Sequence, residues 1–523
     1  MDADHDDPNP LHAPSPVAGP ASPDGTDETT AAERIDPEEL ARCLAVLRGA
    51  EQLDPDHPDA LALRRATGRL FKAVKKQRRL DRRAAISAAD AAVVAATATG
   101  SPRRIDDETA GLPLVSNARG ASAGSLQRAR ACYVCKELYT QVDAFYHQLC
   151  PACASLNHDR RAARTDLTGR RALLTGGRAK IGMYIALRLL RDGAHTTITT
   201  RFPRDAVRRF TAMEDSADWL HRLTVVGLDL RDPAQVVALA DEVAAAGPLD
   251  ILINNAAQTV RRSTGSYAPL VEAEQAPLPH GPLPHLITFE HASDAHPAAL
   301  VSAVGTDAPR HHDDDAAPGT ARALAVAHAD HLTGEALRAG SSSLARLARG
   351  DAIDAGGLLP DLHASNSWVA TVDQVDALEM LEVQLCNMTA PFILVSRLRP
   401  ALAASSARRT YVVNVSAMEG VFSRGYKGPG HPHTNMAKAA VNMLTRTSAT
   451  ELFDDGILMT SVDTGWITDE RPHPTKVRLA EEGFHAPLDL VDGAARVYDP
   501  IVRGESGEDL YGVFLKDYSP AAW

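Results

Sequence analysis

The chain has 523 residues, a formal net charge of −12 and 44% hydrophobic residues, of which few are aromatic. This length is too great for one ordinary core, so we expect two folded units together with disordered stretches. The negative charge argues against affinity of the whole protein for nucleic acid. Because we find no secretory signal and no stretch approaching the ~20 apolar residues of a membrane span, we expect a cytoplasmic protein with no membrane partner.

The N-terminal part divides into three predicted segments. Residues 1–35 are rich in Pro, Asp and Ala without an apolar period, which predicts a disordered acidic tail. Residues 36–100 predict a small helical module, with one helix near 58–74 that is joined to or followed by another near 79–96. Residues 101–125 form a polar, glycine-rich linker.

A dense basic run of Lys and Arg residues lies between Arg64 and Arg83. Next to the cysteine-rich segment described below, which we expect to bind zinc, such a run raises the possibility of a nucleic-acid-binding protein. Leu70, Phe71 and Val74 give the same helix an apolar face, so we favour a docked helix with a solvated basic side. We therefore do not expect nucleic acid as a partner.

Two Cys-x-x-Cys pairs lie within residues 126–163 and are separated by fourteen residues: Cys132, Cys135, Cys150 and Cys153. Each pair can present two thiolates, and two pairs complete a tetrahedral four-cysteine zinc site. Because four thiolates fill the coordination shell, we expect this zinc to be structural. A redox dithiol pair or an iron centre are the alternatives.

Residues 164–523 alternate between short apolar strands and helices, which predicts an α/β fold with a parallel sheet covered by helices on both faces. The strands are expected at 171–175, 194–200, 223–228, 251–254, 411–415 and 457–462, and the helices at 183–192, 233–246, 375–402 and 435–453. The alternation stops at about 262–367, a low-complexity insertion that we interpret as disordered or as a lid.

The turn after the first of these strands is rich in glycine and reads Thr175-Gly-Gly-Arg-Ala-Lys-Ile-Gly182. Glycines at this place let the backbone approach a pyrophosphate, and the N-terminus of the following helix favours its charge. Two further motifs end the third and fourth strands, Asp229-Leu230 and Asn254-Asn255-Ala256-Ala257.

The order and separation of these motifs resemble the short-chain dehydrogenase/reductase family, over residues 164–523 apart from the insertion. The resemblance implies a doubly wound Rossmann sheet with the cofactor bound at the glycine turn. Asp229 would contact the adenine, with Leu230 beside it, and Asn255 and Ala256 would shape the cofactor wall. Thr468 would touch the nicotinamide carboxamide, because Thr464-Gly465 stands where the family has Pro-Gly.

The glycine turn departs from the family pattern at one position. Thr175, Gly176 and Gly182 match, but Lys180 replaces the middle glycine, next to Ile181. This change puts close backbone approach in doubt at one point and adds a cation near the phosphates.

The end of the second strand indicates which dinucleotide binds. An acidic residue there would bind the ribose hydroxyls of NAD, whereas an arginine accommodates the extra phosphate of NADP. The strand ends with Arg201, and Arg178 lies in the glycine turn. We therefore expect NADP rather than NAD, with Arg201 as a solvated loop charge being the alternative.

The family's catalytic set is an Asn, a Ser, a Tyr and a Lys. By the resemblance, Asn387 supports a water relay and Lys438 holds the nicotinamide ribose. Thr434 stands four residues before Lys438, where the family has its tyrosine. The serine position falls on Ala417, with Ser416 one residue earlier. We expect Ser416 or Thr434 to orient the substrate oxygen.

The proton donor is left open by the missing tyrosine. An aliphatic hydroxyl is a far weaker acid than a phenol of pKa about 10, so Thr434 would not readily protonate a substrate. Tyr426, on a glycine-rich loop, is our first candidate, followed by His433 and then Glu419. A proton from the substrate or from water, or a loss of redox chemistry, are further alternatives.

Together these motifs predict an NADP-dependent oxidoreductase that transfers hydride between the nicotinamide and a carbonyl or alcohol substrate. The alternative is a sensor or scaffold protein that kept the NADP pocket but altered its catalysis. Family members usually associate through the helices that carry Asn387 and Lys438, so we expect a homo-oligomer.

Overall fold

The computed structural model describes residues 35–102, 104, 116, 118–289, 356–359, 361–468 and 470–523. Almost all of the predicted acidic tail, much of the predicted linker and the centre of the insertion lie outside these described residues. The chain divides into two compact units, Met1–Ala85 and Ile86–Trp523, and each is described by itself.

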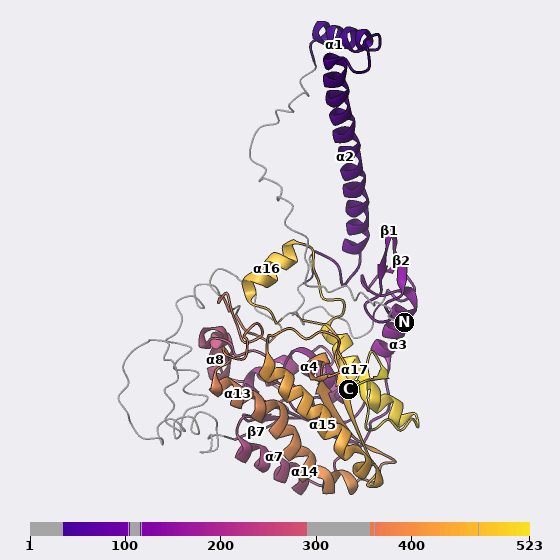
Figure 1. The fold of residues 1–523 in the computed structure, drawn as a ribbon. Helices are drawn as coiled ribbons and strands as arrows, with labels where there is room; N and C mark the ends of the chain where they lie inside the picture. Colours follow the sequence, from indigo (N-terminus) through magenta and orange to yellow (C-terminus); the bar gives the residue numbers. More distant parts are fainter. Residues whose placement is uncertain are drawn as a thin grey trace, which may run out of the picture. The chain divides into compact units, whose positions relative to one another are not determined.

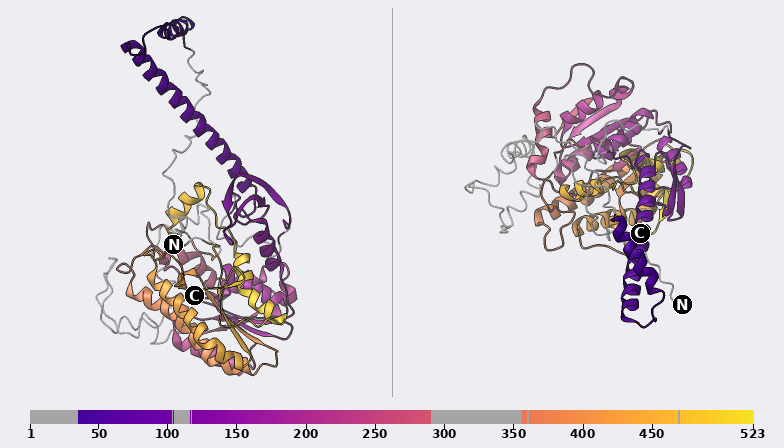
Figure 2. Two further views of the ribbon diagram at one scale, coloured as in Figure 1. Left: turned by 45° about the vertical axis from the view of Figure 1, so that its right-hand side comes forward. Right: turned by 90° about the horizontal axis from the view of Figure 1, so that it is seen from above.

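The N-terminal unit contains α1 (Pro37–Ala50) and most of α2 (Pro58–Ala95). Asp36 caps α1 by accepting hydrogen bonds from the backbone N–H groups of Glu38 and Glu39. Figure 2 shows α2 as one unbroken helix, because neither glycine nor proline interrupts the run of good helix formers between the two predicted segments. Leu70 and Phe71 are exposed, so within this unit the apolar face that we expected to be docked is uncovered.

The cysteine segment begins earlier than predicted. An antiparallel hairpin is formed by β1 (Ser122–Ala131) and β2 (Leu138–Asp143), followed by α3 (Pro151–Ala162). Val142 of this hairpin, and Tyr146 and Leu149 between β2 and α3, share a buried hydrophobic cluster with the large sheet and its helices. The segment is therefore part of the larger unit rather than a separate domain.

The large sheet has nine strands in the order β11-β10-β9-β8-β6-β3-β4-β5-β7. All neighbouring pairs are parallel except β10 and β11. The strand order reverses between β3 and β6, and open α/β sheets bind ligands outside the carboxyl ends of the strands at such a point. The strands are β3 (Arg171–Leu174), β4 (His195–Thr200), β5 (Leu223–Gly227), β6 (Ile251–Asn254), β7 (His285–Thr288), β8 (Thr410–Ser416), β9 (Ile457–Asp463), β10 (Phe514–Lys516) and β11 (Ser519–Ala521).

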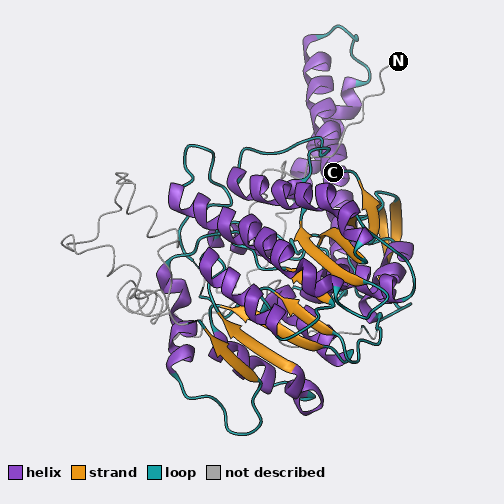
Figure 3. Ribbon diagram, turned by 90° about the horizontal axis from the view of Figure 1, so that it is seen from below, coloured by secondary structure: helices purple, strands orange, loops and turns teal. Residues whose placement is uncertain are grey.

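Helices cover both faces of this sheet, as predicted (Figures 1 and 3). One buried cluster joins the sheet to α4 (Lys180–Arg191), α5 (Pro203–Thr211) and α17 (Leu490–Glu505). The second cluster joins it to α7 (Pro233–Ala245), α14 (Ala390–Ala403) and α15 (Pro432–Asp454). The shorter helices are α6 (Ser216–Trp219), α13 (Ala377–Gln384) and α16 (His473–Glu481).

The helical run Ala377–Ala403 is long and apolar enough, by length and composition alone, to cross a membrane. Leu394, Leu398 and Leu402 of this run are buried in the second cluster against the sheet. Packing in the core of the α/β domain therefore accounts for its apolar composition.

The first part of the insertion is ordered, which corrects our expectation for residues 262–289. It forms α8 (Ala268–Gln275) and then β7, which pairs in parallel with β5 and extends the sheet by one strand. The apolar runs here are only two residues long, Leu270-Val271 and Leu286-Ile287, too short to show a period in the sequence. Residues 290–355 lie outside the described residues.

Candidate active site

The glycine turn between β3 and α4 is packed so tightly that side chains are excluded. Gly176 has a φ of 72°, and a Cβ atom there would lie 2.9 Å from the Cα of Ala256. A Cβ on Gly182 would lie 2.0 Å from the carbonyl oxygen of Gly176. Both positions therefore require glycine. A tightly packed glycine turn that leads into the N-terminus of a helix is the kind of turn that binds the pyrophosphate of a dinucleotide.

Lys180 keeps the shape of this turn although it replaces a glycine of the family pattern. Its φ is 53°, in the left-handed region that glycine adopts without strain. The backbone conformation is therefore retained at a cost on the order of 1 kcal/mol. The turn thus keeps a backbone conformation that glycine would adopt, and Lys180 adds a Cβ atom and a cationic side chain at this point.

The loop after β6 is tied to the glycine turn. The hydroxyl of Thr175 accepts hydrogen bonds from the backbone N–H groups of Asn255 and Ala256, both at 3.0 Å. The Asn255 side chain donates to the carbonyl oxygens of Thr175 and Gly176, at 3.0 and 3.1 Å. These contacts hold the two loops of the switch point together as one wall.

Asp229, which follows β5, is engaged by an arginine that the sequence analysis missed. Arg231 donates from Nε and Nη2 to the Asp229 carboxylate, and from Nη1 to Glu382 at 2.7 Å. Glu382 lies 151 residues away in α13, so only the fold reveals this pairing. Leu230, between the two paired residues, is buried.

Arginines gather at the carboxyl end of β4. Arg178 donates to Asp205 at 2.5 Å and to the carbonyl of Gly356 at 2.7 Å. Asp205 also accepts from Arg209 at 2.7 Å. Arg201 is exposed and lies over the rings of Phe202 and Tyr267, at 5.7 and 5.5 Å.

Arg178 also lies over the Phe202 ring, at 5.4 Å. The net charge at this end of β4 is positive. Arg178 and Arg201 are thus neighbours, and Asp205 offsets only part of the charge of Arg178, Arg201 and Arg209. The pair of arginines predicted from the sequence is therefore brought together, although Arg178 is already ion-paired.

Lys438 is partly buried beside the end of β8. Its Nζ donates to the carbonyl of Val415 at 2.7 Å, and burial lowers its pKa to about 8. Thr434 lies one helical turn earlier, on the same face of α15. The hydroxyls of Thr434 and Ser416 are both buried and have no hydrogen-bond partner among the described residues. Both hydroxyl groups thus have unused hydrogen-bonding capacity among the described residues.

Asn387 sits in a π-helical turn (Leu385–Thr389) between α13 and α14. Its side chain accepts from the backbone N–H of Gln258 at 2.7 Å and donates to the carbonyl of Gln258 at 2.9 Å. Such π-turns inside α-helices occur frequently at functional sites. Here the turn directs the amide to the loop that follows β6.

The three candidate proton donors lie in different environments. Tyr426 is 56% exposed, and its hydroxyl forms no hydrogen bond with any described residue. His433 is buried, its Nε2 lies 3.9 Å from a Glu379 carboxylate oxygen, and burial lowers its pKa. Glu419 lies in a short 3₁₀ turn (Met418–Gly420) that follows β8. None of the three makes a hydrogen bond to Thr434 or Lys438 within the described residues.

Thr468 lies on the loop after β9, where its hydroxyl donates to Glu470 at 3.4 Å. Two residues earlier, the backbone N–H of Trp466 donates to the hydroxyl of Tyr133 at 2.9 Å. Tyr133 belongs to the first cysteine pair. The loop predicted to face the nicotinamide is therefore in contact with the cysteine segment.

The sulfur atoms of the cysteine pairs converge. All four lie within 4.8 Å of one another, and Cys135 Sγ is 3.6 Å from Cys150 Sγ. A tetrahedral zinc site with Zn–S bonds of about 2.3 Å has S···S edges of about 3.8 Å, whereas a disulfide is about 2.05 Å long. All four cysteines are free thiols, so the cluster fits a four-thiolate metal ion.

The fold and the switch-point turn define a nucleotide-binding α/β domain of the Rossmann type. The family model described as short chain dehydrogenase matches residues 170–272. This match includes β3, the glycine turn, β4, β5 and β6, so the part of the chain that carries the glycine turn is similar to short-chain dehydrogenases.

Two relatives illustrate how the similarity is distributed. The chain is 29% identical over 384 residues to the uncharacterized protein R665 of Acanthamoeba polyphaga mimivirus, which covers 71% of each chain. It is 43% identical over 91 residues to a probable oxidoreductase of Streptomyces antibioticus, covering 17% of this chain and 30% of that protein. The Streptomyces protein is thus matched over less than a third of its length.

A similar solved structure is the Pseudomonas aeruginosa RhlG/NADP active-site complex, with 18% identity and a TM-score of 0.39. The similarity covers 67% of this chain and 95% of that one.

Proposed function

We propose that the protein is an NADP-dependent oxidoreductase that acts on a carbonyl or alcohol substrate. The observation that carries this proposal is the arginine pair at the end of β4. Arg201 and Arg178 lie within 6 Å of the same Phe202 ring, and Arg201 is exposed with no acidic partner among the described residues. An arginine at this position matches the 2′-phosphate of NADP and not the ribose hydroxyls of NAD.

The remaining cofactor contacts follow from the packed turn. Backbone N–H groups near Gly176 and Gly182 would bind the pyrophosphate, with Lys180 and Ile181 beside it. Asn255 and Ala256 would line the cofactor, Asp229 and Leu230 would flank the adenine, and Thr468 would face the nicotinamide. Bound there, NADP would supply the hydride donor or acceptor.

Four residues of the chain would serve the substrate side. Lys438, with a pKa of about 8, would hold the nicotinamide ribose. The buried, unpartnered hydroxyls of Ser416 and Thr434 would orient the substrate oxygen. Asn387 would fix the loop at Gln258, which it bonds twice.

Because Thr434 stands in the tyrosine position, another group must donate the proton. Tyr426 is the first candidate, because it carries a phenol and its side chain is exposed on a loop. His433 and Glu419 are the alternatives. Turnover by a Tyr426→Phe variant at the wild-type rate would remove Tyr426 from the mechanism, and His433→Gln is the next variant.

A second candidate function is a sensor or scaffold protein that binds NADP without turnover. It is favoured by Thr434, whose hydroxyl is too weak an acid to replace a phenol. Lys438 and Asn387 count against it, because a pure binding pocket has less need of Asn387.

Titration with NADPH and with NADH, followed by a panel of carbonyl compounds, separates these functions. Binding of NADPH with oxidation by any compound supports the oxidoreductase. Binding without turnover favours the sensor. No binding of either dinucleotide refutes both.

The assembly and location that we propose are a cytoplasmic homo-oligomer without nucleic acid or membrane partners. Exposed apolar side chains on α14 and α15 support self-association: Phe392, Met436 and Met443. Light scattering of the purified protein measures the assembly directly.

A further inference from the structure

We propose that the four cysteines bind one zinc ion, and that the zinc-bearing segment positions the loop 464–489, which carries Thr468, by holding it at both ends. A four-thiolate donor set suits zinc, and it leaves no open coordination position for chemistry on the metal. The role of the ion must then lie in what the segment contacts.

The backbone around the four cysteines is folded as in a metal site made of two Cys-x-x-Cys turns, which we call knuckles. The backbone N–H of Cys150 donates to the sulfur of Cys132 at 3.3 Å, which joins the two pairs. Lys136, directly after the first pair, has a φ of 66°, which turns the chain sharply behind Cys135. The N–H of Lys136 closes this turn by donating to the carbonyl of Cys132 at 3.1 Å.

The start of the loop is held by the first cysteine pair. Tyr133 lies between Cys132 and Cys135, and its backbone N–H donates to the carbonyl of Gln148, next to the second pair, at 2.8 Å. Its hydroxyl accepts the hydrogen bond from the backbone N–H of Trp466 at 2.9 Å. The position of Trp466, two residues before Thr468, thus depends on the placement of a side chain that both knuckles fix.

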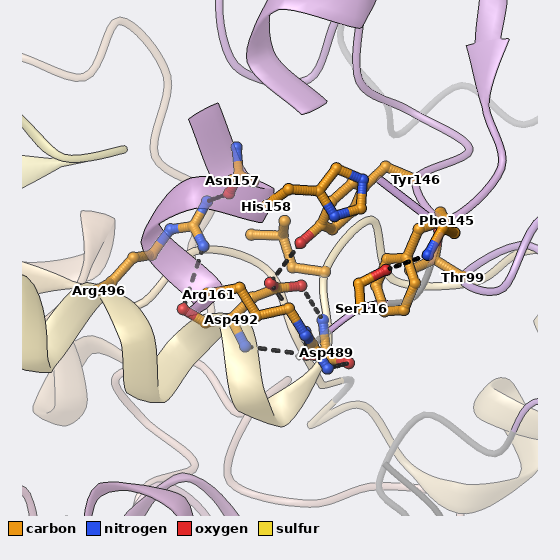
Figure 4. A network of polar contacts seen from close by, with 12 residues as sticks. Thr99, Ser116, Phe145, Tyr146, Asn157, His158, Arg161, Asp489, Asp492 and Arg496 are labelled. Carbon is orange, nitrogen blue, oxygen red and sulfur yellow. Dashed lines mark hydrogen bonds and ion pairs between the residues drawn. The ribbon is translucent and has the colours of Figure 1, made fainter. Parts of the chain in front are cut away.

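The end of the loop is held through the second pair. Cys150 is the N-cap of α3, Cys153 lies in its first turn, and Arg161 lies near its C-terminus. Arg161 is fully buried and donates to Asp489 at 2.7 and 2.8 Å and to Asp492 at 3.0 Å. Figure 4 shows this network at the start of α17.

Two further hydrogen bonds help to hold the end of the loop. Tyr146, four residues before Cys150, donates its hydroxyl to Asp492 at 2.6 Å. Gln148 donates to the carbonyl of His485 at 3.4 Å. Because Asp489 and Asp492 form the capping box of α17, these contacts fix the residue at which the loop ends and the helix begins.

The contacts at the two ends of the loop make its conformation depend on the metal. The hairpin and the knuckles are short, so removing the ion frees Tyr133 and the start of α3 together. The loop between these two sets of contacts contains α16 and Thr468. The effect on dinucleotide affinity rests on the proposed function, whereas the effect on the order of the loop does not.

The test compares three variants of the full chain with the wild type. Cys135→Ser removes a metal ligand. Tyr133→Phe keeps the ring and removes only the hydroxyl that accepts from Trp466. Tyr139→Phe is the matched control, because its hydroxyl belongs to the same hairpin but donates to the carbonyl of His147 at 2.9 Å.

Three measurements are made on each protein: zinc content by elemental analysis, hydrogen exchange of the peptide that contains Trp466, and affinity for NADPH. We expect one zinc per wild-type chain and less than one in Cys135→Ser. In Tyr133→Phe, zinc is retained while exchange at Trp466 accelerates roughly fivefold, which corresponds to one lost hydrogen bond of about 1 kcal/mol. Tyr139→Phe exchanges at the wild-type rate there.

Several outcomes overturn the inference. A wild-type chain without zinc after expression in zinc-supplemented medium removes the metal site. Equal exchange at Trp466 in Tyr133→Phe and Tyr139→Phe removes the positioning role. If hydrogen exchange at Trp466 changes as expected but neither the wild type nor Tyr133→Phe binds NADPH, the positioning role stands and the proposed function fails. The failure of one proposal is thus distinguished from the failure of the other.

Discussion

Arg161 of α3 donates two hydrogen bonds to Asp489 at the start of α17, and both side chains are almost completely buried. These residues are 328 positions apart in the chain. A buried pair of this kind is expensive to break, because removing one partner leaves a charge without compensation.

Replacing Arg161 by methionine should therefore destabilise the protein strongly. It leaves the carboxylates of Asp489 and Asp492 buried without their cation, and we expect a loss of about 3–5 kcal/mol in the free energy of unfolding. Urea denaturation measures this loss. Arg397→Met is the control, because Arg397 pairs with Asp241 at the surface and should contribute less than about 1 kcal/mol. Similar losses in both variants would contradict the prediction.

Replacing Arg201 by alanine should change the dinucleotide preference. A charge-assisted hydrogen bond to the 2′-phosphate contributes about 1.5–3 kcal/mol, so NADPH affinity should fall at least about tenfold while NADH affinity stays constant. Fluorescence titration with both dinucleotides checks this. Arg204→Ala, in the first turn of α5, should leave both affinities unchanged, and an equal loss for NADH in Arg201→Ala would refute the assignment.

Replacing Lys180 by glycine should relieve backbone strain. Its φ of 53° costs a non-glycine residue on the order of 1 kcal/mol, part of which is offset by the greater unfolded-state entropy of glycine. We expect Lys180→Gly to be more stable than Lys180→Ala by about 0.5–1 kcal/mol, since both variants lose the same side-chain contacts. Thermal unfolding compares them, and equal midpoints would show that the turn is unstrained.

Asp463, at the end of β9, should make stability depend on pH. Burial, together with the charges of Asp517 and Glu419, raises its pKa to about 6, above the ordinary value of 3.8. For a carboxyl group with a raised pKa, the protonated form stabilises the fold below pH 3.8, and this contribution is lost as the pH rises through 6.

The isosteric variant Asp463→Asn should consequently be more stable than the wild type at pH 8, by roughly 2 kcal/mol. The difference should shrink by at least half at pH 4.5, because Asp463 is then protonated in the fold. Urea denaturation at the two pH values measures both differences. A gain that is the same at both pH values would mean that ionisation of Asp463 is not its cause.

The sequence predicted most of the sheet because its strands are buried and apolar. β6 was placed to the residue, and β3, β4, β5, β8 and β9 to within one residue at each end. β1, β2, β7, β10 and β11 were missed, because they are edge or hairpin strands without a long apolar run, so that pairing with their partners, and not their own pattern, defines them.

The predicted site residues are still expectations for function, but their placement has physical reasons. Spacing along one helix was enough to relate Thr434 to Lys438. Contacts between distant segments were not foreseeable, such as Arg231 with Glu382 or Tyr133 with Trp466. Such pairs depend on how helices and loops approach one another in space, which no local pattern records.

The strand β7 and the glycine at 356 have a consequence for how the chain can vary. β7 leaves the sheet beside β5, and the chain re-enters at Gly356, whose carbonyl receives the hydrogen bond from Arg178. The segment before residue 290 is thus held by a strand, and Gly356 is held by an arginine of the glycine turn after β3. Because the described residues on either side of 290–355 are held to the domain separately, a change in the length of the chain between them need not shift β5 or β7.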